Sequence, residues 1–277
     1  MRKVVIDLRC TASYNEGHLE EAFSFPWERL RDESCGLPPR EVALTAIVDG
    51  SIDVEAVQMY LERFRYAALE IRTMLEGERR VRTPPTGFCW SPNPFLTNVV
   101  EEVERASSGS GFALDVGSGT GRDMVFLASR GWSVVGIENR RRLIEQGVAL
   151  AHKHGVAGRV LHLCCDIKKH YPIAPGTVDL LHICRFMHRP SLENLLRLPR
   201  TEGYVVYSHF LEGCERTVIA HPATPASFWR RGELQRVLCD SGYAVLREEE
   251  VTLPDSRPFQ NILAQRKSPL SPNSSIG

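Results

Sequence analysis

The sequence predicts an α/β protein in two parts: a doubly wound, mostly parallel sheet in the C-terminal part and a smaller α/β domain before it. Strand and helix patterns alternate from residue 94 onward, which is typical of a parallel sheet covered by helices on both faces. The hydrophobic segment 112–116 leads into Asp-x-Gly-x-Gly-x-Gly, a turn from a strand into a helix. The segment 83–87, Thr-Pro-Pro-Thr-Gly, interrupts regular structure and separates the two parts.

The N-terminal part carries short buried strand patterns and one helical pattern. Strands are predicted over 3–8, 43–48 and 67–74. A helix is predicted over 53–64, because apolar residues recur there at helical spacing. We assign residues 1–80 to this domain and residues 81–93 to a linker.

The C-terminal domain is assigned to residues 94–266. Its predicted helices cover 94–106, 121–129, 140–154 and 231–239, and its predicted strands cover 112–116, 133–137, 160–164, 178–183, 203–209, 243–251 and 259–265. The last two strands are expected to pair antiparallel. Residues 267–277 are rich in Ser and Pro and are predicted to be a disordered tail.

The composition argues against several classes of protein. Of the 277 residues, 34 are Lys or Arg and 34 are Asp or Glu, so no net charge favours nucleic acid or an anionic membrane. No apolar run approaches the roughly 20 residues that span a bilayer, and the N-terminal apolar run is too short for a signal peptide. We therefore expect a cytoplasmic protein. The eight cysteines form no Cys-x-x-Cys pair, so no metal site is expected.

The glycine turn is the first candidate site. Gly117, Gly119 and Gly121 occupy alternate positions, so the backbone can turn sharply and approach a ligand closely. A nicotinamide-binding turn, Gly-x-Gly-x-x-Gly, would need its third glycine at Arg122. Asp115, before the turn, is expected to take part in ligand binding. The alternative is a tight strand-to-helix turn without a ligand.

Two further acidic residues follow the next two strands. Glu138 closes the strand 133–137, where its two oxygens can accept hydrogen bonds from both hydroxyls of a ribose. Asp166 follows the strand 160–164 and can accept from an adenine amino group, while Ile167 or Cys165 lines the ring. The alternatives are an acid that stabilises a helix N-terminus for Glu138 and an ordinary turn residue for Asp166.

The stretch from Ala113 to Asp166 resembles a class I S-adenosylmethionine-dependent methyltransferase. Further segments resemble the tellurite-resistance-type branch: Gly119-Thr120-Gly121-Arg122-Asp123, Cys184-Arg185-Phe186-Met187-His188-Arg189-Pro190, Phe210-Leu211-Glu212-Gly213 and Trp90-Ser91-Pro92-Asn93-Pro94-Phe95-Leu96. The resemblance covers about residues 88 to 266. It implies a seven-stranded, Rossmann-like domain with S-adenosyl-L-methionine as cofactor, held by the glycine turn, Asp115, Glu138 and Asp166.

The acceptor is expected at the end of the strand 178–183, beside the methyl group. His182, Arg185 and His188 are the candidate catalytic residues there, with Arg189 next to them and His209 at the end of the following strand. Histidine can accept a proton near neutral pH, and arginine can hold an anionic acceptor. Each could instead be a packed or surface residue. As a set they favour a small anionic or thiol acceptor. The segment 211–229 is either a lid or an excursion without function.

The opening of the chain resembles a rhodanese domain over about residues 3 to 76. The residues that carry the resemblance are Val5-Ile6-Asp7-Leu8-Arg9, Tyr14-Asn15-Glu16-Gly17-His18-Leu19-Glu20-Glu21-Ala22 and Pro26. A sulfurtransferase needs a cysteine in the loop after the central strand, whereas this chain has Val48-Asp49-Gly50-Ser51-Ile52-Asp53 there. We therefore expect an inactive rhodanese-like module that docks a protein partner or regulates the enzyme.

Three functions compete at this stage. The first is an S-adenosylmethionine-dependent methyltransferase with a small-molecule substrate. The second is a regulatory protein that binds S-adenosylmethionine or S-adenosylhomocysteine without turnover. The third is a sulfurtransferase, which the missing loop cysteine argues against. The sequence leaves the acceptor open among metalloid oxyanions, small thiols, a protein side chain and RNA.

Overall fold

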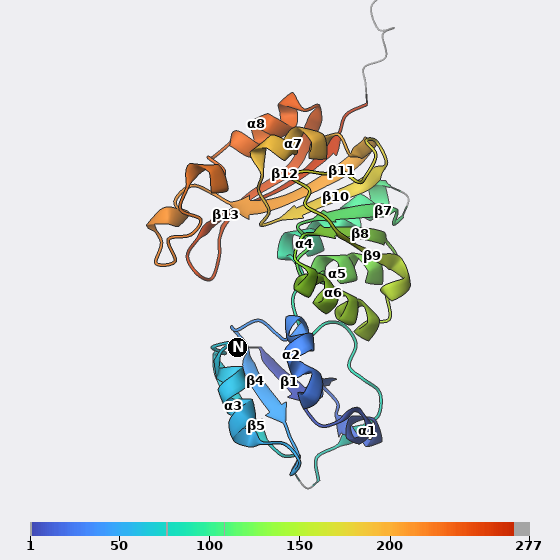
Figure 1. Ribbon diagram of the computed structural model, residues 1–277, viewed down its shortest axis with the longest axis vertical. Coiled ribbons are helices and arrows are strands. Elements are labelled where there is room, and N and C mark those ends of the chain that lie inside the picture. The colour runs from blue at the N-terminus through green and yellow to red at the C-terminus, as the bar shows by residue number, and fades with distance from the viewer. Residues whose placement is uncertain (1, 76, 108, 269–277) are drawn as a thin grey trace, which may run out of the picture. The chain divides into compact units, whose positions relative to one another are not determined.

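The computed structural model describes residues 2–75, 77–107 and 109–268 (Figure 1). It divides into two compact units, one that ends at Ser91 and one that begins at Pro92. Within the described residues, no helix is both long enough and apolar enough to cross a membrane.

A parallel four-stranded sheet in the order β3-β1-β4-β5 forms the centre of the first unit. Its strands are β1 (Lys3–Asp7), β3 (Ala22–Ser24), β4 (Ala43–Ile47) and β5 (Ala68–Arg72). A short antiparallel pair joins β2 (His18–Leu19) and β6 (Arg80–Val81). The helices are α1 (Thr11–Glu16), α2 (Leu30–Glu33) and α3 (Val54–Glu62), with 3₁₀ turns η1 (Trp27–Arg29) and η2 (Ser34–Gly36).

The three strands and the helix predicted for the first unit lie close to their predicted positions, with shorter ends, whereas α1, α2, β2, β3 and β6 were not predicted. Helix α3 starts at Val54 because the Asp53 carboxylate accepts hydrogen bonds from the backbone N–H groups of Glu55 and Ala56. Strand β6 and Cys89 belong to this unit, since β6 pairs with β2 and Cys89 packs in the apolar core. Part of the segment 81–93, expected to be a linker, is therefore folded into the first unit.

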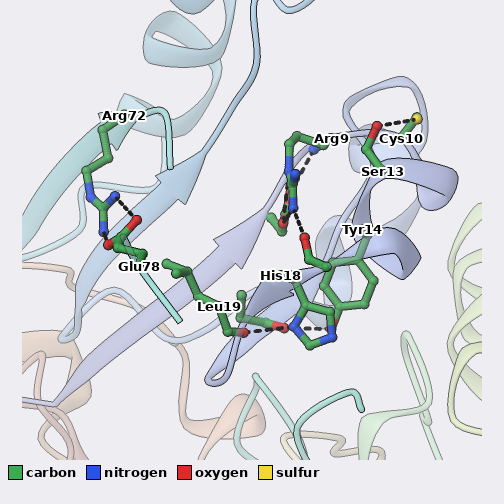
Figure 2. Close-up of polar contacts among 11 residues, drawn as sticks. Arg9, Cys10, Ser13, Tyr14, His18, Leu19, Arg72 and Glu78 are labelled. Carbon is green, nitrogen blue, oxygen red and sulfur yellow. Dashed lines mark hydrogen bonds and ion pairs between the residues drawn. The ribbon is translucent and has the colours of Figure 1, made fainter. Parts of the chain in front are cut away.

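Figure 2 shows the polar contacts that order the chain after β1. The Arg9 guanidinium donates to both carboxylate oxygens of Asp7 and, at 2.8 Å, to the Gly17 carbonyl. The rings of Tyr14 and His18 stack with their centroids 3.9 Å apart. These contacts fix the path of the chain from β1 through α1 to β2.

A seven-stranded sheet in the order β12-β13-β11-β10-β7-β8-β9 forms the second unit. The strands are β7 (Phe112–Val116), β8 (Ser133–Glu138), β9 (Val160–Cys164), β10 (Val178–Cys184), β11 (Pro199–Phe210), β12 (Tyr243–Thr252) and β13 (Pro258–Arg266). Strands β7 to β11 are parallel, and β13 runs antiparallel to both of its neighbours. This confirms the predicted mixed α/β fold with a mostly parallel central sheet.

Helices cover both faces of this sheet (Figure 1). They are α4 (Pro94–Ala106), α5 (Arg122–Ser129), α6 (Arg141–Lys153), α7 (Arg189–Leu196) and α8 (Glu233–Asp240), with 3₁₀ turns η3 (Ala157–Arg159), η4 (Cys214–Arg216) and η5 (Pro225–Ser227). Leucines of α7 and α8 pack in one apolar core with Leu114, Leu181 and Val205 of the sheet. Helices α4, α5 and α6 lie on the opposite face. Because β7 and β10 are central, their carboxyl ends lie between the two helical layers.

Three details of the second unit differ from the sequence prediction. Helix α7 was not predicted, and it follows β10 directly with Pro190 in its first turn. Helix α8 begins at Glu233 rather than at 231, because Gly232 has a φ of +70° and cannot be part of the helix. Of the predicted tail, Lys267 donates its N–H to the Gly242 carbonyl, and residues 269–277 lie outside the described residues.

Candidate functional site

The glycine turn follows β7 at the carboxyl end of the sheet. Gly117, Gly119 and Gly121 all have positive φ angles, of +71°, +55° and +71°. A Cβ atom at Gly117 would lie 2.9 Å from the Cβ of Phe186, so this position has no room for a side chain. At Gly119 a Cβ would meet only a backbone oxygen at 4.0 Å. The turn is therefore closed by Phe186 on one side and leaves open space above Gly119.

Glu138 ends β8 and lies beside the same turn. Its side chain is 6% exposed. One carboxylate oxygen accepts from the backbone N–H groups of Asn139 and Arg140, and the other accepts from Gly119 at 3.1 Å. The carboxylate thus joins the ends of two neighbouring strands. The first oxygen also pairs with the Arg140 guanidinium at 3.3 Å, whereas the oxygen that faces Gly119 has one donor and can accept from a ligand hydroxyl group.

Asp166 and Ile167 lie in the turn after β9. The Asp166 carboxylate accepts from the backbone N–H of Lys168 at 3.1 Å, a contact that orders the turn itself. Ile167 is 4% exposed and packs in the core that includes Ile137 and Leu181. The turn role of Asp166 is thus visible in the structure, and its predicted adenine contact stays a prediction.

A buried cluster of ionisable residues lies beneath the glycine turn. His182 of β10 is fully buried, and its Nδ1 lies 2.9 Å from an oxygen of Asp115 on β7. Its Nε2 lies 3.8 Å from an oxygen of Asp123 in the first turn of α5. Burial lowers the pKa of His182, but the charges of Asp115 and Asp123 outweigh this effect and the pKa is raised. His182 is thus a buried partner of Asp115, whereas the sequence analysis placed it beside the acceptor.

Asp123 and Asn93 lie in the motifs quoted above but were not predicted to be site residues. The other oxygen of Asp123 accepts from the Asn93 backbone N–H at 2.7 Å. The Asn93 side chain caps α4 by accepting from Phe95 and Leu96, and it donates to the Cys184 sulfur at 3.3 Å. Asp123 stands two residues after the third glycine, and this position in the motif was the available signal.

Arg185 directly follows β10 and has a φ of +54°, a strained angle for a residue with a side chain. Its guanidinium lies over the rings of Phe210 and Phe259, 5.8 and 5.7 Å from their centroids. Among the described residues, no carboxylate is within ion-pair distance of Arg185. The exposed guanidinium is therefore able to receive an anion.

The other predicted acceptor residues are held by protein contacts. His188 precedes α7, and its Nδ1 lies 2.5 Å from the Ser191 hydroxyl. Arg189 forms an ion pair with Glu233 and donates to the Phe228 carbonyl. The structure thus leaves Arg185 as the most accessible of the four candidates at this strand end, since His182 is fully buried and the other two are half-buried.

Metal binding has no support in the described part of the chain. None of its His, Cys, Asp and Glu side chains gather in a group of three or more that could hold a metal ion.

Comparison with known protein families gives one match. Residues 113–201 match the family model described as a methyltransferase domain. This stretch contains the glycine turn, Glu138, Asp166 and the end of β10. It agrees with the prediction that the chain is an enzyme of the methyltransferase class. A comparison with curated proteins finds no match.

Solved structures share the fold of the second unit at low sequence identity. A methyltransferase from Methanosarcina mazei, described as S-adenosylmethionine-dependent, has 17% identity and a TM-score of 0.50, covering 65% of this chain and 100% of its own. Magnesium protoporphyrin IX methyltransferase from Synechocystis PCC 6803, with S-adenosylhomocysteine bound, has 14% identity and a TM-score of 0.50, covering 62% and 81%. The [4+2]-cyclase SpnF has 15% identity and a TM-score of 0.51, covering 62% and 81%. Since the last is described as a cyclase, this likeness shows the fold and not the reaction.

Proposed function

We propose that this chain is an S-adenosyl-L-methionine-dependent methyltransferase whose cofactor site lies at the carboxyl ends of β7, β8 and β9. The observation that carries the proposal is the Gly119–Glu138 pair, which combines an approach that no side chain blocks with a buried carboxylate held by the Gly119 N–H. The open backbone at Gly119 lets a ligand come close to the turn, and a ribose suits Glu138. The methyltransferase-domain match and the fold support this assignment.

The residues present fit such a cofactor on a further point. Asp115 offers a carboxylate near the expected position of the cofactor's ammonium group. In this proposal Asp166 and Ile167 bind the adenine, with Asp166 accepting from its amino group.

The bound cofactor would supply a methyl group on a sulfonium, which an acceptor displaces in line. The protein's own part is to align the acceptor, exclude water and, for an unionised acceptor, take its proton. We assign anion binding to Arg185 and proton transfer to His188. His182 supports Asp115 from below the turn instead of touching the acceptor.

The acceptor class follows from the same residues. A small anionic or thiol acceptor fits an exposed guanidinium held on two aromatic rings. Membership of the tellurite-resistance-type branch and a cytoplasmic location remain part of the proposal. Binding without turnover would be favoured if Arg185 and His188 pointed into the core, and Arg185 is exposed.

We propose residues 1–80, which form most of the first unit, as an inactive rhodanese-like module for a protein partner. Its loop after β4 has no cysteine, and the carboxylates of this loop accept hydrogen bonds from nearby backbone N–H groups. Asp49 accepts from the Ser51 N–H and hydroxyl, and Asp53 caps α3. In an assay of sulfur transfer from thiosulfate to cyanide, we expect the rate with the protein to equal the rate without it.

The test of the proposed function is methyl transfer from labelled S-adenosylmethionine into a cell extract separated into small molecules, protein and RNA. Glu138→Ala should reduce cofactor affinity by roughly 10- to 150-fold, because the ribose hydroxyls lose a charged partner worth about 1.5–3 kcal/mol. Glu145→Ala is the matched control, since Glu145 is an exposed glutamate of α6 paired with Arg141.

We expect label in the small-molecule fraction with wild type and with Glu145→Ala, and no label with Glu138→Ala. Equal cofactor affinity in all three proteins would refute the assigned role of Glu138. Cofactor binding without any labelled product would favour the regulatory binding protein instead.

A further inference from the structure

Three ionisable side chains form a continuous row under the glycine turn, two of them buried and the third, that of Asp123, 16% exposed. Asp115, His182 and Asp123 come from β7, β10 and α5, and the histidine lies between the two acids at 2.9 and 3.8 Å. His182 is 0% exposed and Asp115 is 3% exposed. The His182 Nε2 has no hydrogen-bond partner among the described residues and faces the Asp123 carboxylate only as an ion pair. Only Asp115 is near the expected position of the cofactor.

Burial and the charge of Asp115 raise the pKa of Asp123, and the charges of Asp115 and Asp123 raise the pKa of His182, so the row favours holding a proton. Two carboxylates separated by one ring repel each other, and burial makes each of them costly without a cation. The other titratable groups that act on the row are Arg122, His162 and Cys184. Burial raises the pKa of the Cys184 thiol to about 12, so it is neutral, and burial lowers the pKa of His162. His182 is therefore the buried group that balances the two acids.

The same row reaches the start of α4. Asp123 accepts from the Asn93 N–H, and the Asn93 side chain both caps α4 and contacts Cys184 on β10. A change in the charge or position of Asp123 therefore acts on the first turn of α4.

We propose that His182 is a positioning residue, whose buried ring orients Asp115 toward the cofactor's ammonium group and, through Asp123 and Asn93, ties the start of α4 to the same site. The Asp115 half of this inference rests on the proposed function, and the α4 half does not. Cofactor binding and the stability of the first turn of α4 are thereby coupled through one buried ring.

The cofactor half is tested by comparing two ligands in calorimetric titrations. S-adenosylmethionine carries the ammonium group, and 5′-methylthioadenosine lacks the whole amino-acid end. In His182→Gln, the affinity for S-adenosylmethionine should fall about tenfold or more, while the affinity for methylthioadenosine should stay within about twofold. Asp115→Asn should show the same selective loss. His152→Gln, an exposed histidine of α6, is the matched control.

The α4 half is tested without any ligand by hydrogen exchange of the amides in 94–106. His182→Gln and Asp123→Asn should each exchange faster in the first turn of α4 than wild type and His152→Gln. If His182→Gln does not fold, Asp123→Asn and Asp115→Asn still test the two halves separately.

The outcomes separate this inference from the proposed function. The inference alone would be overturned if wild type binds both ligands and His182→Gln either keeps both affinities or loses the same factor for both. Wild type that binds neither ligand would overturn the proposed function and the cofactor half with it. If amide hydrogen exchange in the first turn of α4 is unchanged in both His182→Gln and Asp123→Asn, the proposed link between His182 and α4 is wrong.

Discussion

His209 illustrates how the fold changes the chemistry of a single residue. It lies near the end of β11, is 3% exposed, and its Nε2 lies 3.1 Å from the Ser227 carbonyl. Its Nδ1 has no hydrogen-bond partner among the described residues. Burial lowers its pKa from 6.5 to about 4, so the ring is neutral at neutral pH. A base role, which the sequence left open for His209, is weakened because so low a pKa makes the ring a poor proton acceptor.

The lowered pKa of His209 predicts a loss of stability in acid. The unfolded chain takes up this proton near pH 6.5 and the folded chain only near pH 4, so stability is lost as the pH falls between these values. The loss is at most about 3 kcal/mol. Urea unfolding of His209→Gln at several pH values from 7 to 4 should show a smaller acid loss than wild type.

The difference between the two proteins is the relevant quantity, because His154, whose pKa burial also lowers to about 4, is present in both. His152→Gln serves as the exposed control. Parallel stability curves for wild type and His209→Gln would contradict the prediction.

At the scale of elements, Arg189 fastens the segment between β11 and α8. The residue opens α7, its guanidinium lies 4.4 Å from the ring centroid of Trp229, and it pairs with Glu233 of α8. Leu211 and Trp229 form a parallel bridge that closes the base of the segment. The segment 211–229 is therefore anchored at its two ends, and a lid motion would be confined to the residues between Leu211 and Trp229.

Arg189→Met should release this anchor while keeping an apolar stem. We expect a loss of about 1–2 kcal/mol in unfolding free energy, less than for a buried pair because Arg189 and Glu233 are 34% and 24% exposed. Limited proteolysis within 211–232 should become faster. Arg197→Met, which breaks an exposed pair with Glu193, is the control and should change little. Equal cleavage rates in the two variants would argue against the anchor.

At the scale of the whole molecule, each unit has its own apolar core. Leu44 is buried in the core of the first unit, and Leu181 is buried in the core of the second. Units with separate cores can unfold as separate cooperative units.

Leu44→Ala should therefore lower the stability of the first unit by about 2–5 kcal/mol through the cavity it leaves. Scanning calorimetry should show one shifted transition, and the affinity for S-adenosylmethionine should not change. Leu181→Ala, the matched substitution in the second unit, should shift the other transition and weaken cofactor binding. A loss of cofactor affinity in Leu44→Ala would show that the two units are energetically coupled.

Much of the second unit could be predicted because its signals are local. Each parallel strand is a short apolar run, and the glycine turn is a contiguous motif whose backbone angles only glycine adopts freely. Helix α7 was missed because only four residues separate it from β10 and it begins with Arg-Pro, without a capping side chain. The candidate positions Gly119 and Glu138 were found because each closes or follows a strand.

The sequence by itself determined the order of the strands in the second unit, the glycine turn and the acid at the end of β8, since these depend on periodicity and on backbone limits within a few residues. The tertiary structure decided which side chains meet. Asp115 and His182 are 67 positions apart and become partners only because β7 and β10 are neighbours in register. It likewise turned His182 inward and left Arg185 exposed three residues later. Such choices depend on packing between distant segments, which a local pattern does not contain.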